Sequence, residues 1–252
     1  MRGPRRREGG NGRGETLEAE ARAGERLSVL YAILSDVHGN LHALRVVLED
    51  LQRHAPDRII CLGDLVGYGA FPNDVTLLIR ETADVVLMGN HDHAALGMTD
   101  ISFFNRYAHQ AALWTRLALT PENRAWLKEL PYDHLERGLY FVHASPVHPE
   151  KWHYVFSDLE AEIAMAASTT ATAFIGHTHV PRDHHTRRGR LINVGSVGQP
   201  RDGDPRAAYT LYDAGTGERR LVRLEYDTAA AGEAIRSAGL PHFLAERLAL
   251  GR

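Results

Sequence analysis

The clearest signal along the chain is a set of short apolar runs that alternate with helical patterns. The first run, residues 29–34, is apolar throughout, as expected of a strand that is covered on both faces. Asn40 then caps a predicted helix over residues 41–53, whose large apolar side chains recur on one face. The alternation predicts a largely parallel sheet with helices outside it. It continues with a strand at 57–62, a helix near 73–81 and a strand at 84–87.

The second half of the chain is richer in strands. Residues 187–190 are predicted to form a hairpin turn, and Ser157 with Glu160 forms a capping box that opens a helix. No repeat and no linker divides the sequence, so residues 27–252 are predicted to form one α/β domain with two sheets. The other predicted elements are helices at 104–117, 122–130, 228–238 and 241–248, and strands at 132–135, 139–143, 171–175, 191–194, 207–213 and 220–225.

Residues 1–26 have a different composition from the rest of the chain. They are rich in Arg, Gly and Glu and contain almost no large apolar side chain. Such a segment cannot bury enough surface to offset the entropy lost on ordering, so we predict a disordered tail. The basic cluster at residues 5–7 leaves open a nucleic-acid-binding arm as the alternative to an incidental tail.

The overall composition narrows the class of protein. The formal net charge is −3 and the body has no basic stripe, so no nucleic-acid partner is expected. No apolar stretch reaches the roughly 18 residues of a membrane helix, and no signal-peptide core is present. The single cysteine, Cys61, cannot form an internal disulfide and lies in an apolar run, where a buried strand thiol is expected. We therefore expect a cytoplasmic protein that does not associate with membranes.

Side chains that can bind metal ions follow the ends of five predicted strands. Ligand sites in open α/β sheets lie beyond the carboxyl ends of the strands, so we expect these segments to converge. Neighbouring glycines such as Gly63, Gly89 and Gly176 permit sharp turns and a close backbone approach. The candidate ligands, in chain order, are Asp36, His38, Asp64, Asn90, His143, His177 and His179, and His91 stands beside them.

This set of side chains has a definite metal chemistry. Carboxylate and amide oxygens combined with neutral imidazoles suit Mn, Fe, Zn or Co, and no thiolate cluster competes. Taken singly, Asp36 or the His177-Thr178-His179 segment is as easily explained as an ordinary turn. The agreement of five segments in chain order and in strand-end position is what predicts a two-metal phosphoryl site.

With these segments the chain resembles the calcineurin-like metallophosphoesterases. The loop that follows Asn193 is similar to that of a small bacterial phosphodiesterase branch, whose members are similar in fold to the retromer scaffold subunit. The resemblance implies two packed mixed β-sheets flanked by helices. The segments that carry it are residues 35–40, 63–69, 89–92, 142–146, 176–181 and 193–201, so it covers roughly residues 28–225.

The resemblance also implies a role for each candidate ligand. Asp36, His38 and His179 would bind one metal, Asn90, His143 and His177 the other, and Asp64 would bridge the two. A hydroxide shared by the metals would then attack phosphorus. His91 would protonate the leaving alkoxide or stabilise charge, with an indirect hydrogen-bonding role as the alternative. Manganese is the predicted metal, and Fe, Zn, Co and Ni are the alternatives.

Position 67 departs from one branch of this family. The protein Ser/Thr phosphatases carry an Asp three residues after the bridging Asp, where it orients the catalytic His, whereas this chain has Gly67. His91 therefore needs another partner, for which Asp92 or a main-chain carbonyl is a candidate. For the substrate, Asn40 at a helix N-terminus and Arg201 are the predicted contacts, and no pair of arginines is evident.

The predicted function is the metal-dependent hydrolysis of phosphodiesters, with phosphomonoesters left open, on a small phosphoester or nucleotide. The alternatives are a non-catalytic scaffold or nucleotide-binding protein of the same fold and, among enzymes, a Ser/Thr-type protein phosphatase. The complete ligand set together with His91 favours catalysis. Specificity is expected in residues 98–119, 146–156 and 184–190, and the sequence does not indicate an oligomeric state.

Overall fold

The apolar run near the start of the folded chain forms β1 (Leu30–Leu34), the central strand of a five-stranded sheet. The computed structural model describes residues 28–252, so the tail predicted for residues 1–26 lies outside the described residues. The strand order is β10-β9-β1-β2-β3, in which β1, β2 and β3 are parallel and β9 runs antiparallel to β1 and to β10. Cys61, at the end of β2, is buried as predicted. The other strands are β2 (Arg58–Cys61), β3 (Val85–Val86), β9 (Ala207–Asp213) and β10 (Arg219–Leu224).

A second five-stranded sheet has the order β4-β5-β6-β8-β7. Its three inner strands are parallel, and both edge strands are antiparallel to their neighbours. Both sheets are therefore mixed, which confirms the fold implied by the family resemblance and corrects the expectation of a largely parallel sheet. The strands are β4 (Asp133–Glu136), β5 (Leu139–Val142), β6 (Thr172–Ile175), β7 (Arg182–Thr186) and β8 (Gly189–Asn193).

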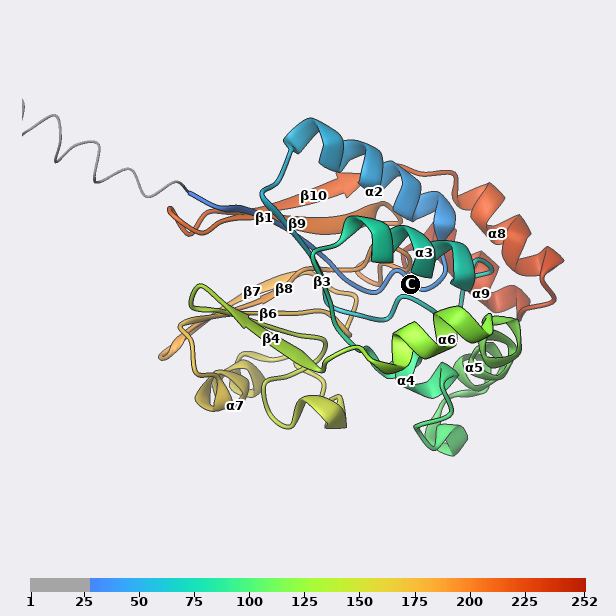
Figure 1. Ribbon diagram of the computed structural model, residues 1–252, viewed down its shortest axis with the longest axis horizontal. Helices are drawn as coiled ribbons and strands as arrows, with labels where there is room; N and C mark the ends of the chain where they lie inside the picture. The colour runs from blue at the N-terminus through green and yellow to red at the C-terminus, as the bar shows by residue number, and fades with distance from the viewer. Residues whose placement is uncertain (1–27) are drawn as a thin grey trace, which may run out of the picture.

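The two sheets pack face to face and bury an aromatic core between them (Figure 1). Tyr31 and Ile33 of β1 point into this core, where Tyr31 meets Phe141 at 5.9 Å between ring centroids. The alternate residues Ala32 and Leu34 belong to the core on the opposite face of the first sheet. Burial on both faces explains why the β1 run shows no polar alternation.

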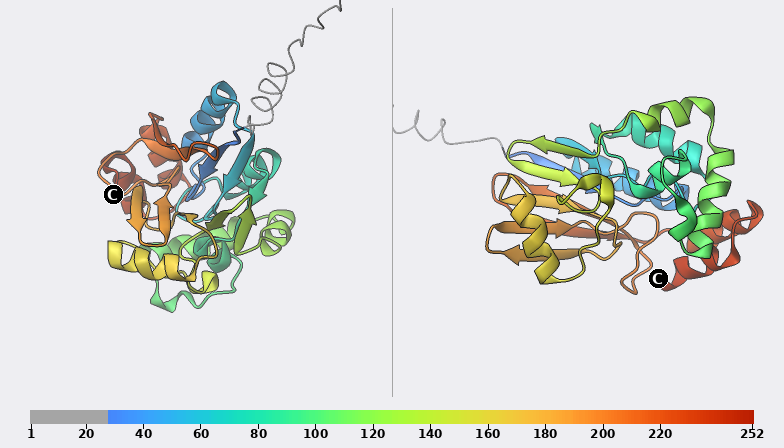
Figure 2. Two further views of the ribbon diagram at one scale, coloured as in Figure 1. Left: turned by 90° about the vertical axis from the view of Figure 1, so that its left-hand side faces the viewer. Right: turned by 90° about the horizontal axis from the view of Figure 1, so that it is seen from below.

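Helices cover the outer faces of both sheets. Helices α2 (Leu41–His54) and α3 (Pro72–Thr82) lie over the first sheet, and α7 (Asp158–Ala167) lies over the second (Figures 1 and 2). The capping predictions are confirmed: the Asn40 side chain accepts a hydrogen bond from Ala43 N, and Ser157 with Glu160 forms a capping box. None of the helices in residues 28–252 combines the length and the apolar character needed to cross a membrane.

Further helices gather at the end of the molecule toward which β1 runs (Figure 1). The short helix α4 was not predicted, because six residues are too few to show a helical period. Helix α5 begins two residues later than predicted, because the Asn105 side chain caps it by accepting from Tyr107 N and Ala108 N. These helices are α4 (Asn90–Ala95), α5 (Arg106–Ala118), α6 (Pro121–Lys128), α8 (Thr228–Ser237) and α9 (His242–Glu246).

The edge strand β7 was also missed by the sequence patterns. Residues 187–190 do lie at a hairpin turn, but it joins β8 to β7, whose sequence Arg-Asp-His-His-Thr is almost entirely polar. An edge strand needs no alternating apolar face, and of its residues only His184 is buried. The hairpin forms the edge of the second sheet and does not line the cavity beside the candidate site, so the expectation that residues 184–190 set specificity gains no support.

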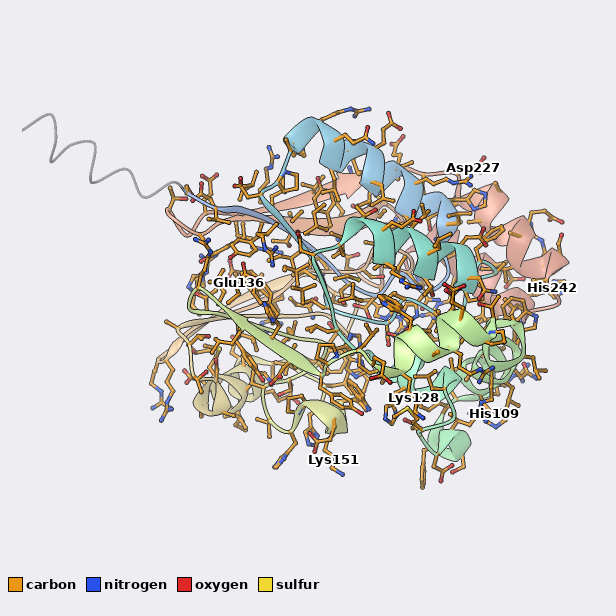
Figure 3. All side chains as sticks on the ribbon, in the orientation of Figure 1. His109, Lys128, Glu136, Lys151, Asp227 and His242 are labelled. Atoms are coloured by element: carbon orange, nitrogen blue, oxygen red, sulfur yellow. The ribbon has the colours of Figure 1, made fainter. Side chains whose placement is uncertain are left out.

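A charged cluster joins the two sheets at the edge opposite the candidate site. Glu136 of β4 accepts hydrogen bonds from Tyr31 of β1 (3.0 Å) and from Arg58 of β2 (2.9 and 3.1 Å), and Figure 3 labels it beside both sheets. Burial raises the pKa of Glu136, but the bonds from Arg58, His134 and Tyr31 outweigh it and lower the pKa to about 2. The ionised carboxylate thus stabilises the contact between the sheets.

We expect Glu136→Gln to lower the free energy of unfolding at pH 7 by about 2 kcal/mol. Since the folded pKa of Glu136 lies below its ordinary value of 4.5, this contribution is complete above that pH and disappears as the pH falls toward 2. Urea unfolding of wild type and variant between pH 7 and pH 2.5 measures the difference. Glu122→Gln, at an exposed ion pair with Arg80, is the control and should cost under about 0.5 kcal/mol. A pH-independent difference would contradict the assignment.

Candidate binuclear metal centre

The candidate ligands lie on loops that continue the strands beyond their carboxyl ends. Asp36 N donates to Gly63 O (3.0 Å), which keeps the loops after β1 and β2 side by side. In the second sheet Gly176 N donates to His143 O (2.8 Å), and Gly198 N donates to Asp36 O (2.9 Å) across the two sheets. The convergence expected from the strand-end positions is therefore present.

One buried group of ligand atoms consists of Asp36, His38 and His179, whose atoms all lie within 4.8 Å of one another. His179 Nε2 is 3.2 Å from Asp36 Oδ1. His38 Nε2 is 3.1 Å from His179 Nε2, so two imidazole nitrogens face each other at close range. Asp36 and His38 come from the first sheet and His179 from the second, so this group spans both sheets.

A second buried group consists of Asp64, His143 and His177. His143 Nε2 is 3.3 Å from Asp64 Oδ2 and 3.2 Å from the Asn90 amide oxygen, which places Asn90 against this group. Asp64 Oδ2 also lies 3.7 Å from His38 Nε2 of the first group. This single oxygen faces one histidine of each group, a position from which a carboxylate can bridge two metal ions.

The imidazoles are held in the tautomer that metal binding requires. The Nδ1 atoms of His38, His143 and His179 contact main-chain carbonyls at 3.0, 3.2 and 2.6 Å. A carbonyl can only accept, so Nδ1 carries a proton in each of these rings, and Nε2 is the atom that faces the centre and can bind a metal. Burial lowers the pKa of His38 and His179, and it lowers that of His177 to about 3, so these rings are neutral.

Several polar atoms at the centre have no hydrogen-bond partner among residues 28–252. Asp36 Oδ2 accepts from His177 N (3.0 Å) and Asp64 Oδ1 accepts from His91 N (2.7 Å), but their other oxygens are buried without a hydrogen bond. His177 Nε2 is likewise buried and unpartnered. Orphaned acceptors of this kind are costly unless a cation satisfies them.

The charge of the centre also indicates a cation site. Burial raises the pKa of Asp36 and Asp64, but the neighbouring histidines outweigh it and hold both values well below the usual range. For His143, burial lowers the pKa, but the carboxylates of Asp64 and Asp36 outweigh it and raise it to about 9. Two ionised carboxylates therefore attract positive charge to this point, and the donor set of oxygen and neutral imidazole fits two divalent transition-metal ions.

The backbone of the centre is strained. Five of the candidate ligands have a positive φ between 50° and 65°, a region that costs a residue with a side chain roughly 1–2 kcal/mol. Nearby glycines are required by close approach: a Cβ on Gly89 would lie 2.1 Å from Asp64 Oδ1, and one on Gly176 would lie 2.5 Å from Asp36 Oδ2. Strain of this kind persists where the surrounding structure enforces it. The five residues are Asp36, His38, Asp64, His177 and His179.

His91 lies at the edge of the centre and is positioned by packing. Its ring centroid is 4.4 Å from that of Tyr68, 4.9 Å from that of His38 and 5.4 Å from that of Phe104. The Asp92 side chain instead accepts from Val66 N and Gly89 N, so the suggestion that Asp92 orients His91 is wrong.

At position 67, where the protein phosphatases carry the Asp that orients the catalytic His, this protein has glycine and therefore no side chain. His91 Nδ1 is buried and has no partner among residues 28–252, and a Cβ at Gly67 would come within 2.9 Å of it. Position 67 therefore adjoins the imidazole, but glycine offers it no hydrogen bond. The ring relies on its aromatic neighbours for orientation.

The two predicted substrate contacts lie in different surroundings. The Asn40 amide donates to Gly198 O (2.8 Å) and accepts from Ala43 N, so both of its ends already bind the protein, and a substrate contact through Asn40 stays a prediction. Arg201 lies over the Tyr68 ring, with its guanidinium carbon 5.7 Å from the centroid, and donates to the Gln199 side chain.

A second arginine, missed in the sequence, accompanies Arg201. Arg247 is half-buried, and burial, followed by the charge of Arg201, lowers its pKa to about 10. Its guanidinium donates to the main-chain oxygen of Arg252, and no Asp or Glu side chain in residues 28–252 forms an ion pair with Arg201 or Arg247. The sequence does not indicate that Arg201 and Arg247 lie close together, because only the folded chain brings the C-terminal turn to Tyr68.

Two mixed sheets with two buried ligand groups at their strand ends define the class: an α/β protein with a candidate binuclear metal centre. The family model of the calcineurin-like phosphoesterase superfamily domain matches residues 29–217. The chain therefore belongs to the calcineurin-like phosphoesterase superfamily, as the motifs indicated.

Relatives in other organisms share nearly the whole fold. The crystal structure of a metallophosphoesterase from Sphaerobacter thermophilus is 36% identical, with a TM-score of 0.81 over 89% of this chain and 100% of that one. The uncharacterized protein MJ0912 of Methanocaldococcus jannaschii is 38% identical over 242 residues, which cover 88% of this chain and 98% of its own. The hypothetical protein PH1004 of Pyrococcus horikoshii OT3, at 23% identity and a TM-score of 0.79 over 89% and 99% of the chains, shares the fold.

Proposed function

We propose that this protein is a metal-dependent phosphodiesterase that acts on small phosphoesters or nucleotides. The observation that carries the proposal is the position of Asp64 Oδ2 between two buried ligand groups, with His91 at their edge. Membership of the phosphoesterase superfamily supports the same reaction type. The cytoplasm is its proposed location, and manganese is the proposed metal.

The side chains divide the work between binding and proton transfer. Asp36, His38 and His179 would hold one divalent ion, Asn90, His143 and His177 would hold the other, and Asp64 would be shared. Ions bound there would activate a water and neutralise phosphate charge. His91, which is not part of either ligand group, is placed to donate a hydrogen bond or a proton to the departing oxygen. Arg201 and Arg247 supply positive charge beside Tyr68 for the non-reacting oxygens.

The preference for diesters rests on what surrounds the centre. A phosphomonoester dianion carries more charge than a diester and calls for more cations around it. The cations that we place near the centre are Arg201 and Arg247, and neither lines the cavity beside the second ligand group. Gly67 also leaves His91 without the acidic partner found in protein phosphatases, and we take both features to favour a singly charged substrate over a phosphoprotein.

Turnover of bis-p-nitrophenyl phosphate against p-nitrophenyl phosphate tests this function, using full-length protein stripped with chelator and reloaded with Mn²⁺. We expect turnover that depends on metal, with kcat/KM about tenfold or more in favour of the diester. A preference for the monoester would make the protein a phosphatase. No turnover of either ester, with two metals bound per chain by elemental analysis, would indicate a scaffold or a nucleotide-binding protein.

A further inference from the structure

A cavity of about 370 Å³ opens beside the second ligand group. Asn90, His91 and His177 line it, so a molecule in the cavity touches both a candidate metal ligand and the proposed proton donor. Its volume falls in the range of about 300–1,000 Å³ that is typical of small-molecule sites. A group bound in the cavity would therefore lie beside the proposed proton donor.

Five aromatic side chains line the cavity together with uncharged polar and small ones. Three separate segments provide the aromatic side chains: the loop after β2, the turn at Ile101–Phe103 with the following residue, and the segment after the turn at Pro149–Lys151. No Asp, Glu, Lys or Arg side chain of residues 28–252 lines the cavity. The aromatic residues are Tyr68, Phe103, Phe104, Trp152 and Tyr154.

Most of these rings already pack on neighbours, and one is free. Tyr154 stacks on His177 at 4.0 Å between centroids, and Phe104 lies against His91. Phe103, in contrast, is 90% exposed at the cavity and stacks on no aromatic ring of residues 28–252. A phenylalanine this exposed does not contribute the free energy that burial of its ring would give. A flat apolar group bound in the cavity would cover the ring and restore that contribution.

We propose that this cavity holds a planar aromatic group carried by the departing alcohol, such as the base of a nucleoside. The proposal rests on the proposed phosphodiesterase function and names the substrate class of the same site. The departing side is assigned because His91, the proposed proton donor, faces the cavity. Stacking on aromatic side chains needs only a flat π-face, so the site accepts different bases.

A pair of diesters isolates the contribution of the base. Adenosine 5′-methyl phosphate is compared with its abasic counterpart, in which hydrogen replaces the base, so that the departing alkoxide is otherwise the same. We expect the Mn²⁺-loaded enzyme to favour the nucleoside ester about 10- to 100-fold in kcat/KM and to release adenosine and methyl phosphate. Equal rates, or release of methanol and adenosine 5′-phosphate, would overturn the proposal.

Two matched variants assign the preference to the cavity. Phe103→Ala should remove most of the preference for the nucleoside ester over the abasic ester. Leu117→Ala, an equally exposed apolar residue at 88% that does not line the cavity, should behave as wild type. A preference that survives intact in Phe103→Ala would place the base elsewhere and overturn the assignment.

A binding measurement separates this inference from catalysis. Saturation-transfer NMR of adenosine with the full-length protein loaded with diamagnetic Zn²⁺ should show contact with the base protons, weakened in Phe103→Ala and retained in Leu117→Ala. Bis-p-nitrophenyl phosphate is assayed on the same Mn²⁺-loaded preparations. If that ester is not hydrolysed, the proposed function itself fails. If it is hydrolysed while the nucleoside and abasic esters react equally and adenosine shows no transfer, this inference alone fails.

Discussion

Asp64→Asn is expected to lower kcat/KM for bis-p-nitrophenyl phosphate by about a thousandfold or more. The substitution keeps the shape of the side chain but removes the charge of Oδ2, which faces His38 at 3.7 Å and His143 at 3.3 Å. A neutral amide cannot balance two cations, and its NH₂ group would point donor hydrogens at the centre. The metal content, measured by elemental analysis after gel filtration, should fall below two ions per chain.

The control for this variant is Asp74→Asn on the exposed surface of α3. It makes the same chemical change away from the centre, and its turnover and metal content should equal those of wild type. Circular dichroism of both variants shows whether the fold is retained. Turnover of Asp64→Asn within tenfold of wild type, with two metals still bound, would contradict a bridging role.

The second large effect is expected at His91. His91→Gln should lower kcat by about 10²- to 10⁴-fold for a diester with an alkyl leaving group. For a p-nitrophenyl leaving group the loss should be much smaller, because p-nitrophenolate is a stable anion that departs without a proton. The metal content should stay at the wild-type value, since the His91 side chain belongs to neither ligand group. Comparing kcat for both types of leaving group in wild type and variant measures proton donation.

His242→Gln serves as the matched control, because His242 begins α9 on the exposed surface, away from the centre (Figure 3). An equal loss of kcat for alkyl and p-nitrophenyl leaving groups would show that His91 stabilises charge on the phosphate instead of donating a proton. Near-normal turnover of both esters in His91→Ala, with metals bound, would remove His91 from the mechanism.

The sequence predicted which side chains converge because each of them has a local signature. Asp36 and His38 follow an apolar run that can only be a buried strand, and strand ends in such sheets face a common crevice. The same reasoning brought His143 of one sheet and Asp64 of the other to one place, 3.3 Å apart. Position along a strand, together with chemical type, was therefore sufficient for the core of the centre.

Other parts of the site have no local signature. The positive φ of Asp36 and His177 is imposed by the loops that pack around them, and aspartate or histidine letters do not reveal it. Arg247 reaches Tyr68 only because the C-terminal turn packs there. The aromatic lining of the cavity likewise forms only where three segments meet in space, and a phenylalanine in the sequence predicts burial, whereas Phe103 is exposed. These features arise from tertiary structure, which a local pattern does not encode.

Each ligand group contains side chains from both sheets, and this has a mechanical consequence. Each group takes side chains from both: Asp36 and His38 join His179 across the interface, and Asp64 joins His143 and His177. Ions bound there would link the two sheets of the sandwich. Separating the sheets would then also break the coordination of both ions, so metal binding would add to the cohesion of the fold.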